Sequence, residues 1–365
     1  MLTYKGLVDL ANALRGRTVL SVYVNGAEAD PAKRRRWRVD LRISLNDIQS
    51  WLEGSPRAER EAFLDCRRRL LEQLDSMRGV IRGPGWAGFY TTDGAFHTGP
   101  VPALVPTMAV WSTGPCLTPY VRALKEGRPV FVLVGDSRKV RIFRYAERTL
   151  SAVETVHAKT TVEHPTHMSA PPRPGFHSGT RGATGADQAQ RELRDGTMHM
   201  LRQVAEKLGQ LATDSAFIVL GGIPAVASAL VRLLPEELAR HTTLAERLDV
   251  HATKAEVAEV ARQSASLMRN AEDLQRVDEA LAGAASNGHG VTGSLDTQRA
   301  LTDGRARDVY FTPAFLENRA ADAEAIVRLA LGTQATLEQV SGQAAARLDA
   351  VGGIAARLRY VTVPA

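Results

Sequence analysis

The chain has 365 residues, 44% of them hydrophobic and 24% charged, which is the composition of a globular protein and excludes a largely disordered one. No apolar run reaches the ~18 residues of a membrane-spanning helix and we recognise no secretory signal, so we expect a cytoplasmic protein without a membrane partner. The two cysteines exclude a disulfide framework and a cysteine-rich metal site, and the length predicts two or three domains.

The net charge of +6 is unevenly distributed along the chain. Lys and Arg exceed Asp and Glu by eighteen to thirteen in residues 1–127 and by sixteen to thirteen in residues 128–251. In residues 252–365 the acidic residues exceed the basic ones by fourteen to twelve. The first two segments therefore favour a polyanionic partner and the last does not, although such small excesses give only weak support for RNA binding.

Residues 1–127 predict a mixed α/β domain. A run rich in β-branched residues predicts a strand over 17–25, and Pro31 then opens a long helix. A second helix is expected over 57–78, followed by two short strands within 85–94 and 104–113.

The long helix opened by Pro31 begins with a dense basic run. It has two interpretations: a solvated helix face, or a set of phosphate contacts with Trp37 stacking on a base. The residues of this run that we assign to RNA are Lys33, Arg34, Arg35, Arg36, Trp37 and Arg38.

The middle of the chain predicts a β-hairpin over 129–145, a third strand over 149–157 and, later, a buried strand that ends at a glycine pair. Between them lies a polar segment, 158–186, with four prolines and four glycines, which excludes a regular helix or strand. Loops of this length inside compact domains are usually functional or disordered. The helix after it is expected to start at Asp187 as N-cap, with Gln190 three residues on. We therefore predict a loop that projects from a packed helix.

Three further motifs have a structural and a functional interpretation. Gly288–Gly293 matches the dinucleotide pattern GxGxxG, but a long predicted helix precedes it where a strand is required, so we expect a linker. The pair Gly221-Gly222 is expected to form a tight strand-to-helix turn rather than a phosphate cradle. A histidine cluster in or beside the loop lacks the other ligands of a metal cage, so solvated or phosphate-contacting side chains are preferred. We expect no cofactor and no metal; the histidines are His157, His164, His167 and His177.

In residues 252–365 strands and helices alternate, which predicts an α/β/α sandwich. Thr253 is expected to cap a very long first helix. Gly352 and Gly353 are expected to form the turn between the last helix and the last strand, with Ile354 and Leu358 buried against the sheet.

The end of the chain, LDAVGGIAARLRY over residues 348–360, is similar to the GGI-A-LRY ending of release factor and Pelota third domains. The turn 293–296 and the helix ending at 300–304 fit the same domain, and the middle order of hairpin, strand, loop, helix and FIVLGG fits as well. Over residues 128–365 the chain thus resembles bacterial members of the archaeo-eukaryotic class-1 release factor superfamily, which includes Pelota-type rescue factors and Balon-type hibernation factors.

The resemblance implies an α/β chain of three domains. They are a mixed α+β N-terminal domain over 1–127, a ribonuclease-H-like middle domain over 128–251 with its long loop at 158–186, and a C-terminal α/β/α sandwich of the kink-turn-binding ribosomal-protein type over 252–365.

In the family, the middle loop carries Gly-Gly-Gln into the peptidyl transferase centre, where it positions the water that cleaves peptidyl-tRNA. This loop has no Gly-Gly-Gln, and in its nearest counterpart Ala183 replaces the second glycine and lacks that residue's conformational freedom. The sequence therefore favours a protein without the family's hydrolytic activity. The residues near the position of the motif that we assign to RNA contact are His177, Arg181, Gly182, Thr184, Gly185, Gln188, Gln190 and Arg191.

The function implied by the resemblance is a translation factor of tRNA-like shape in the ribosomal A site. The first domain would face the decoding region of 16S rRNA, the loop would reach 23S rRNA, and the third domain would face the stalk base or a translational GTPase. Hibernation or recognition of stalled ribosomes is the preferred role. Two alternatives stay open: a peptidyl-tRNA hydrolase that uses Gln188 or a loop histidine, and an RNA-binding adaptor that never enters the ribosome.

Overall fold

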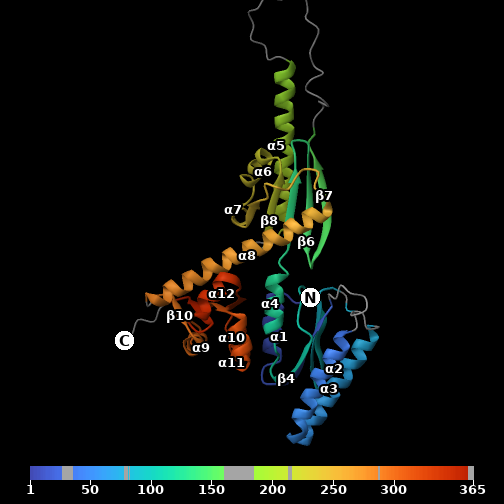
Figure 1. Cartoon of the computed structure of the whole chain (residues 1–365), viewed down its shortest axis with the longest axis vertical. Coiled ribbons are helices and arrows are strands. Elements are labelled where there is room, and N and C mark those ends of the chain that lie inside the picture. The colour runs from blue at the N-terminus through green and yellow to red at the C-terminus, as the bar shows by residue number, and fades with distance from the viewer. Residues whose placement is uncertain are drawn as a thin grey trace, which may run out of the picture. The chain divides into compact units, whose positions relative to one another are not determined.

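The computed structural model describes residues 1–26, 36–77, 81, 83–159, 185–212, 216–286 and 288–360. These residues form two compact units (Figure 1). The terminal unit contains residues 1–127 and 269–365, and the middle unit contains residues 128–268. Within the described part of the chain, no helix is both long and apolar enough to cross a membrane. The proposed division into three domains stays a prediction, whereas the expected α/β class with helices on three sheets is confirmed.

The middle unit is built on a five-stranded sheet of order β7-β6-β5-β8-β9. The first three strands are antiparallel neighbours, and β8 and β9 continue the sheet parallel to β5. This is the strand order of a ribonuclease-H-like domain, and the expected hairpin and third strand are confirmed. The strands are β5 (Val130–Gly135), β6 (Lys139–Ala146), β7 (Thr149–His157), β8 (Phe217–Gly222) and β9 (Thr242–Leu244).

Helices cover both faces of the middle sheet. One face packs against α5 (Gly185–Leu211), α6 (Pro224–Val231) and α7 (Glu236–Arg240), and the other against the beginning of α8 (Lys254–Ala285). The helix α5 is packed, as expected, through apolar residues buried between Met200 and Leu208, whereas Leu211, its last residue, is 41% exposed. The structure places the buried residues of α5 at Met200, Leu201, Val204, Ala205 and Leu208.

The start of α5 differs from the sequence prediction. The helix begins at Gly185, so Asp187 lies inside the first turn and is not the N-cap. An N-cap residue needs a non-helical backbone, and residue type alone does not determine where the helical backbone begins. The cap predicted at Thr253 is correct: its hydroxyl accepts the amide hydrogen of Glu256, whose carboxylate in turn accepts the amide hydrogen of Thr253.

Gly222 shows why the strand β8 ends in two glycines. Its φ of +93° lies in the left-handed region, and a Cβ added there would stand 2.1 Å from the carbonyl oxygen of Gly135. The tight-turn interpretation of Gly221-Gly222 is therefore sufficient to explain both residues, since a Cβ on Gly221 would meet Leu248 at 2.7 Å.

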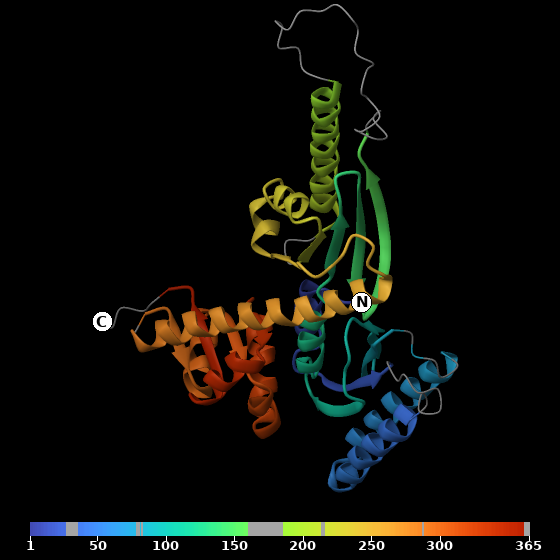
Figure 2. The ribbon, with the colours of Figure 1, turned by 45° about the horizontal axis from the view of Figure 1, so that its top comes forward.

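The first sheet of the terminal unit has the order β3-β2-β1-β4, and all its neighbours are antiparallel. One face is covered by α2 (Arg36–Trp51) and α3 (Arg57–Ser76), which the short helix η1 (Leu52–Gly54) joins. The two helices lie side by side in both views (Figures 1 and 2). The strands are β1 (Thr18–Asn25), β2 (Gly85–Thr91), β3 (Gly94–Val101) and β4 (Met108–Thr113).

The central strand β1 is buried on both faces, which explains its nearly continuous run of apolar residues. Leu20, Val22 and Val24 face α2 and α3. Val19 and Tyr23 face two helices that we did not predict, α1 (Tyr4–Ala13) and α4 (Thr118–Glu126).

The third sheet has the order β10-β13-β11-β12, with only β11 and β12 parallel. Helices α9 (Ser294–Thr302), α10 (Pro313–Asn318) and α11 (Ala320–Gly332) cover one face. Helix α12 (Gly342–Asp349) and the end of α8 cover the other, so the expected α/β/α sandwich is confirmed. The strands are β10 (Gly290–Thr292), β11 (Ala306–Phe311), β12 (Thr336–Gln339) and β13 (Ile354–Leu358).

The turn before β13 is also as predicted. Gly352 and Gly353 have φ values of +101° and +76°, and Ile354 and Leu358 are buried. Glycine is favoured at both turn positions because other residues rarely adopt such angles.

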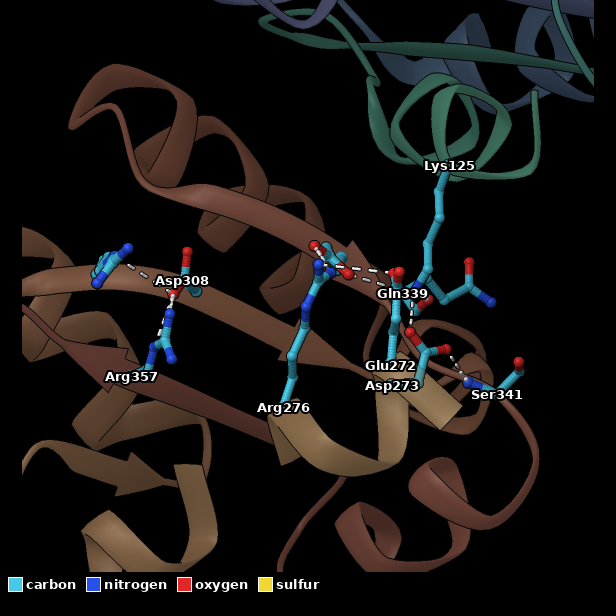
Figure 3. Close-up of polar contacts among 10 residues, drawn as sticks. Lys125, Glu272, Asp273, Arg276, Asp308, Gln339, Ser341 and Arg357 are labelled. Carbon is cyan, nitrogen blue, oxygen red and sulfur yellow. Dashed lines mark hydrogen bonds and ion pairs between the residues drawn. The ribbon is translucent and has the colours of Figure 1, made fainter. Parts of the chain in front are cut away.

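A shared core joins the two ends of the chain in the terminal unit. Residues Ile326, Val327 and Leu331 of α11 belong to the same apolar cluster as Leu7 of α1 and Tyr120 of α4. Beside it, the ammonium group of Lys125 on α4 lies 2.5 Å from the carboxylate of Asp273 on α8 (Figure 3). The first and third sheets are thus parts of one packed body.

Candidate nucleic-acid interface

The pair α2–α3 buries one apolar stripe of each helix against the sheet and presents arginines and some apolar side chains on its outer surface. The exposed apolar residues are Val39, Ile43, Trp51, Leu64 and Leu71. Trp37, Leu41 and Leu45 recur every four residues along α2 and are buried, so Arg38 and Arg42, each next to a stripe residue, lie on the exposed side of the helix. On α3 the buried residues Phe63 and Leu70 form the matching stripe. The arginines on the flanks of these stripes therefore lie at the surface.

Between the two helices lies a hollow of about 240 Å³, which we call the α2–α3 trough. Arg38 lies 3.8 Å from Asp75, whereas neither Arg42 nor Arg67 forms an ion pair with a described residue. Three guanidinium groups thus meet one carboxylate around a partly apolar floor. The lining residues are Trp37, Arg38, Leu41, Arg42, Leu45, Arg67, Leu71, Leu74 and Asp75.

Arg67 is held in place without being neutralised. Its guanidinium donates to the side-chain oxygen of Asn46 at 3.0 Å and also to that of Gln49. An amide oxygen fixes the orientation of a guanidinium group but leaves its charge uncompensated. The neighbouring Arg68 and Arg69, in contrast, both pair with Asp65. Two arginines of this helix pair without a described ion-pair partner, Arg42 and Arg67, therefore lie at the trough.

Of the basic run predicted to contact RNA, the structure describes only the last part. Arg36 and Arg38 belong to α2 and are exposed, and Arg36 lies 4.0 Å from Asp40. Lys33, Arg34 and Arg35 lie outside the described residues.

The expected stacking of a base on Trp37 conflicts with the structure. The side chain is only 6% exposed and packs in the core beneath the helices, with the Arg38 guanidinium 5.5 Å above its ring. The exposed tryptophan of α2 is Trp51, at 69%. The α2 stripe continues to the buried Leu52, which places Trp51 off the stripe, and this spacing is a signal that the sequence already contained.

The second part of the candidate interface is the beginning of α5. Gly185 is its first residue and Gln188 lies in the first turn, as expected, while Gln190 and Arg191 are exposed. The expected contacts of His177, Arg181, Gly182 and Thr184 fall outside the described residues.

One turn of the middle sheet anchors both elements that flank residues 160–184. Asp136 accepts the backbone N–H groups of Arg138 and Lys139, at 2.7 and 2.9 Å, and thereby fixes the turn between β5 and β6. Ala158, just after β7, donates its backbone N–H to the carbonyl oxygen of Arg138. The Thr197 hydroxyl of α5 lies 2.7 Å from the backbone carbonyl oxygen of Ser137. The exit from β7 and the body of α5 are therefore held on a single rigid support.

The GxGxxG run at 288–293 is explained by packing. Gly290 lies in β10 against α8, and a Cβ there would stand 2.2 Å from the carbonyl oxygen of Ala280. As expected, the long helix α8 precedes the run. Close backbone approach, rather than a pyrophosphate, accounts for this glycine.

Residues 115–266 match the family model of the bacterial archaeo-eukaryotic release factor family 10. This match confirms the resemblance to the bacterial release factor group over the middle part of the chain. No curated protein matches the sequence.

Solved structures give distant likenesses of fold. Pelota of Archaeoglobus fulgidus is 16% identical, with 65% of this chain and 67% of that chain covered and a TM-score of 0.35. Dom34 of S. cerevisiae, a translation termination-like factor involved in RNA quality control, is 12% identical, with 64% and 63% covered and a TM-score of 0.46. The archaeal translation termination factor aRF1 is 14% identical, with 98% and 99% covered and a TM-score of 0.26.

Proposed function

With residues 115–266 matching a bacterial archaeo-eukaryotic release factor family, we propose that this protein is a ribosome-associated factor that occupies the A site without releasing the peptide. Hibernation, or recognition of a stalled ribosome, is the role that fits such a factor. The C-terminal part, with its small acidic excess, is the part proposed to face a translational GTPase or the stalk base.

The α2–α3 trough is the observation that carries the proposal. Arg42 and Arg67 offer charges that no described carboxylate neutralises, beside an apolar floor, and the exposed Trp51 lies at the end of the same helix α2. Guanidinium groups suit phosphate oxygens geometrically, and an exposed aromatic ring accepts a stacked base. The guanidinium groups and the exposed indole are suited to ribosomal RNA.

The loop sequence supports binding over hydrolysis. A hydrolase needs a group that positions water and donors for the developing oxyanion. The family supplies both with Gly-Gly-Gln, and no such triplet occurs between 158 and 186. The rigid support of Asp136 and Thr197 is nevertheless suited to hold a projecting segment at a fixed place.

The test of the trough is the salt dependence of ribosome binding. In the double variant Arg42→Gln/Arg67→Gln, two phosphate contacts are lost. The logarithm of the ribosome-binding constant should then fall less steeply with the logarithm of salt concentration, with a slope smaller in magnitude by about 2. Arg57→Gln/Arg68→Gln is the matched control, because it removes the same charge from arginines already paired with Glu61 and Asp65. Pelleting with ribosomes across a salt series measures both. Equal slopes for the two variants would show that the trough does not contact the ribosome. A parent protein that does not pellet with monosomes would favour the RNA-binding adaptor that never enters the ribosome.

The test of the loop combines occupancy with peptide release. We expect the intact protein to release almost no peptide from programmed ribosomes, and deletion of residues 160–184 to weaken its competition with A-site tRNA. If the intact protein releases peptide and Gln188→Ala does not, the protein is a peptidyl-tRNA hydrolase rather than a binding factor. Unchanged competition after the deletion would show that the loop contributes nothing to occupancy.

A further inference from the structure

The terminal unit contains a cavity of about 610 Å³ between its N-terminal and C-terminal parts. One wall comes from β4 and the start of α4, with Met108 and Val110, and the other from α10 and α11, with Leu316 and Ala321. Small-molecule sites commonly measure 300–1,000 Å³ and are mainly apolar with a few polar groups. The size and the lining of this cavity are those of a ligand site.

A charged group without a hydrogen-bond partner lines the cavity. The Nη1 atom of Arg328 is buried and has no acceptor within the described part of the chain. The side chain is also packed, because a Cβ added to Gly114 would stand 2.9 Å from its Cδ. A buried donor of this kind costs free energy until an acceptor reaches it.

The nearby carboxylate does not fill this role. Glu324, one turn before Arg328 on α11, accepts the amide hydrogen of Leu117 at 2.8 Å and the hydroxyl of Thr118 at 2.6 Å. Both of its oxygens are thus committed to the start of α4. The other acid in the lining, Glu317, is exposed to solvent, and Arg122 pairs with Glu126 outside the lining. Arg328 is the cation left for a ligand.

Gln339 adds a second polar contact. Its side-chain oxygen is buried and has no donor among the described residues, and the residue lines the same cavity. A ligand with an N–H or O–H group would satisfy it.

We propose that this cavity binds a small amphipathic carboxylate, with its apolar body between β4 and α11 and its carboxylate on Arg328. The ligand contacts residues from both ends of the chain, so its binding stabilises the terminal unit by mass action. This site is independent of the proposed ribosomal role, since it shares no residue with the α2–α3 trough or with the loop.

The test uses two probes that share an apolar body and differ in charge. 8-Anilinonaphthalene-1-sulfonate carries one anionic group, and N-phenyl-1-naphthylamine carries none. The full chain should bind one sulfonate probe saturably, and decanoate should displace it at lower concentration than decanol. Arg328→Met should weaken the sulfonate probe about tenfold and leave the neutral probe unchanged, because only the charge-assisted hydrogen bond is lost. Arg319→Met is the control, because this arginine on α11's N-terminal side pairs with Asp322 and does not line the cavity.

Ala321→Trp provides a second, independent variant. Its small side chain is exposed in the cavity wall, so an indole there should fill the space and abolish binding of both probes without disturbing the core. Equal affinity of the sulfonate probe for the parent and Arg328→Met proteins would overturn the proposal. Probe binding that persists in Ala321→Trp would also overturn it. If Arg328→Met binds neither probe, the displacement experiment on the parent protein decides, and equal displacement by decanoate and decanol would overturn the proposal.

Discussion

Lys125 forms the most deeply buried ion pair described in the terminal unit. The side chains of Lys125 and Asp273 are 14% and 2% exposed, and the ammonium group also donates to the carbonyl oxygen of Gln339 (Figure 3). Burial raises the pKa of Asp273, while Lys125 and the amide of Ser341 act in the opposite direction. The aspartate is thus kept charged in an apolar place largely by one lysine.

Lys125→Met should lower the free energy of unfolding of the terminal unit by about 3–5 kcal/mol at neutral pH, because it leaves a buried carboxylate without its cation. All four tryptophans lie in this unit, so urea unfolding followed by tryptophan fluorescence reports on it alone. Arg122→Met, which breaks an exposed pair on the same helix, should cost less than about 1 kcal/mol. Similar decreases in the free energy of unfolding for the two variants would mean that the buried ion pair contributes no more to stability than the exposed one.

The loss in Lys125→Met should also depend on pH. The folded pKa of Asp273 is raised above its unfolded value, so between these two values the folded state binds more protons and stability falls as pH rises. Removing Lys125 raises the folded pKa further and widens this window. The difference between variant and parent should therefore shrink on acidification toward the unfolded pKa, and a difference that grows instead would contradict the assignment.

Among the elements, β13 shows how a short strand can organise a sheet. It lies between β10 and β11 and pairs antiparallel with both, and four of its five residues are buried. Ala355 allows α8 and α12 to approach one face, while Ile354, Ala356 and Leu358 lie on the other. The strand therefore couples the two helical layers of the third sheet.

Leu358→Ala should destabilise the terminal unit by ~2–5 kcal/mol, because it leaves a cavity at the edge of the shared core. The same fluorescence-detected urea unfolding measures it. Leu295→Ala, at an exposed position on α9, is the matched control and should have little effect. A loss below ~1 kcal/mol for Leu358→Ala would be inconsistent with its packing in this core.

On the scale of the whole molecule, the two ends of the chain fold as one unit and the middle forms another. The cluster around α11 contains residues from both 1–127 and 269–365, so neither segment alone can bury the apolar residues of this cluster. The middle unit has its own apolar clusters on both faces of its sheet. The units that fold independently are therefore not consecutive segments of the chain, because one of them combines its two ends.

A fragment experiment checks this arrangement. Residues 1–127 contain every tryptophan, and alone they should unfold at a lower urea concentration than the terminal unit of the full chain, because the surface that packs on α11 is uncovered. Adding residues 269–365, which lack tryptophan, should raise the urea midpoint of the tryptophan transition. Residues 128–268 are the control and should show cooperative unfolding by circular dichroism. A urea midpoint of 1–127 alone equal to that of the full chain would contradict the shared core.

The sequence by itself determined the features that depend on neighbours along the chain. The alternation of apolar residues predicted the hairpin and third strand of the middle unit, and Thr253 marked the start of α8. The glycine pair before Ile354 predicted the turn into β13. Each of these signals lies within a few residues, since backbone angles and side-chain periodicity are local properties.

The tertiary structure alone decided which side chains meet across the chain. In the sequence, Trp37 resembles an exposed aromatic residue within a basic run, yet its position on the α2 stripe places it beneath the helices. Arg67 becomes part of the trough only when α3 packs beside α2. Lys125 and Asp273 are 148 residues apart, and Arg328 meets the β4–α4 wall only because α11 packs there. No local pattern encodes these contacts, because they arise when separate apolar stripes are buried against one another in a common core.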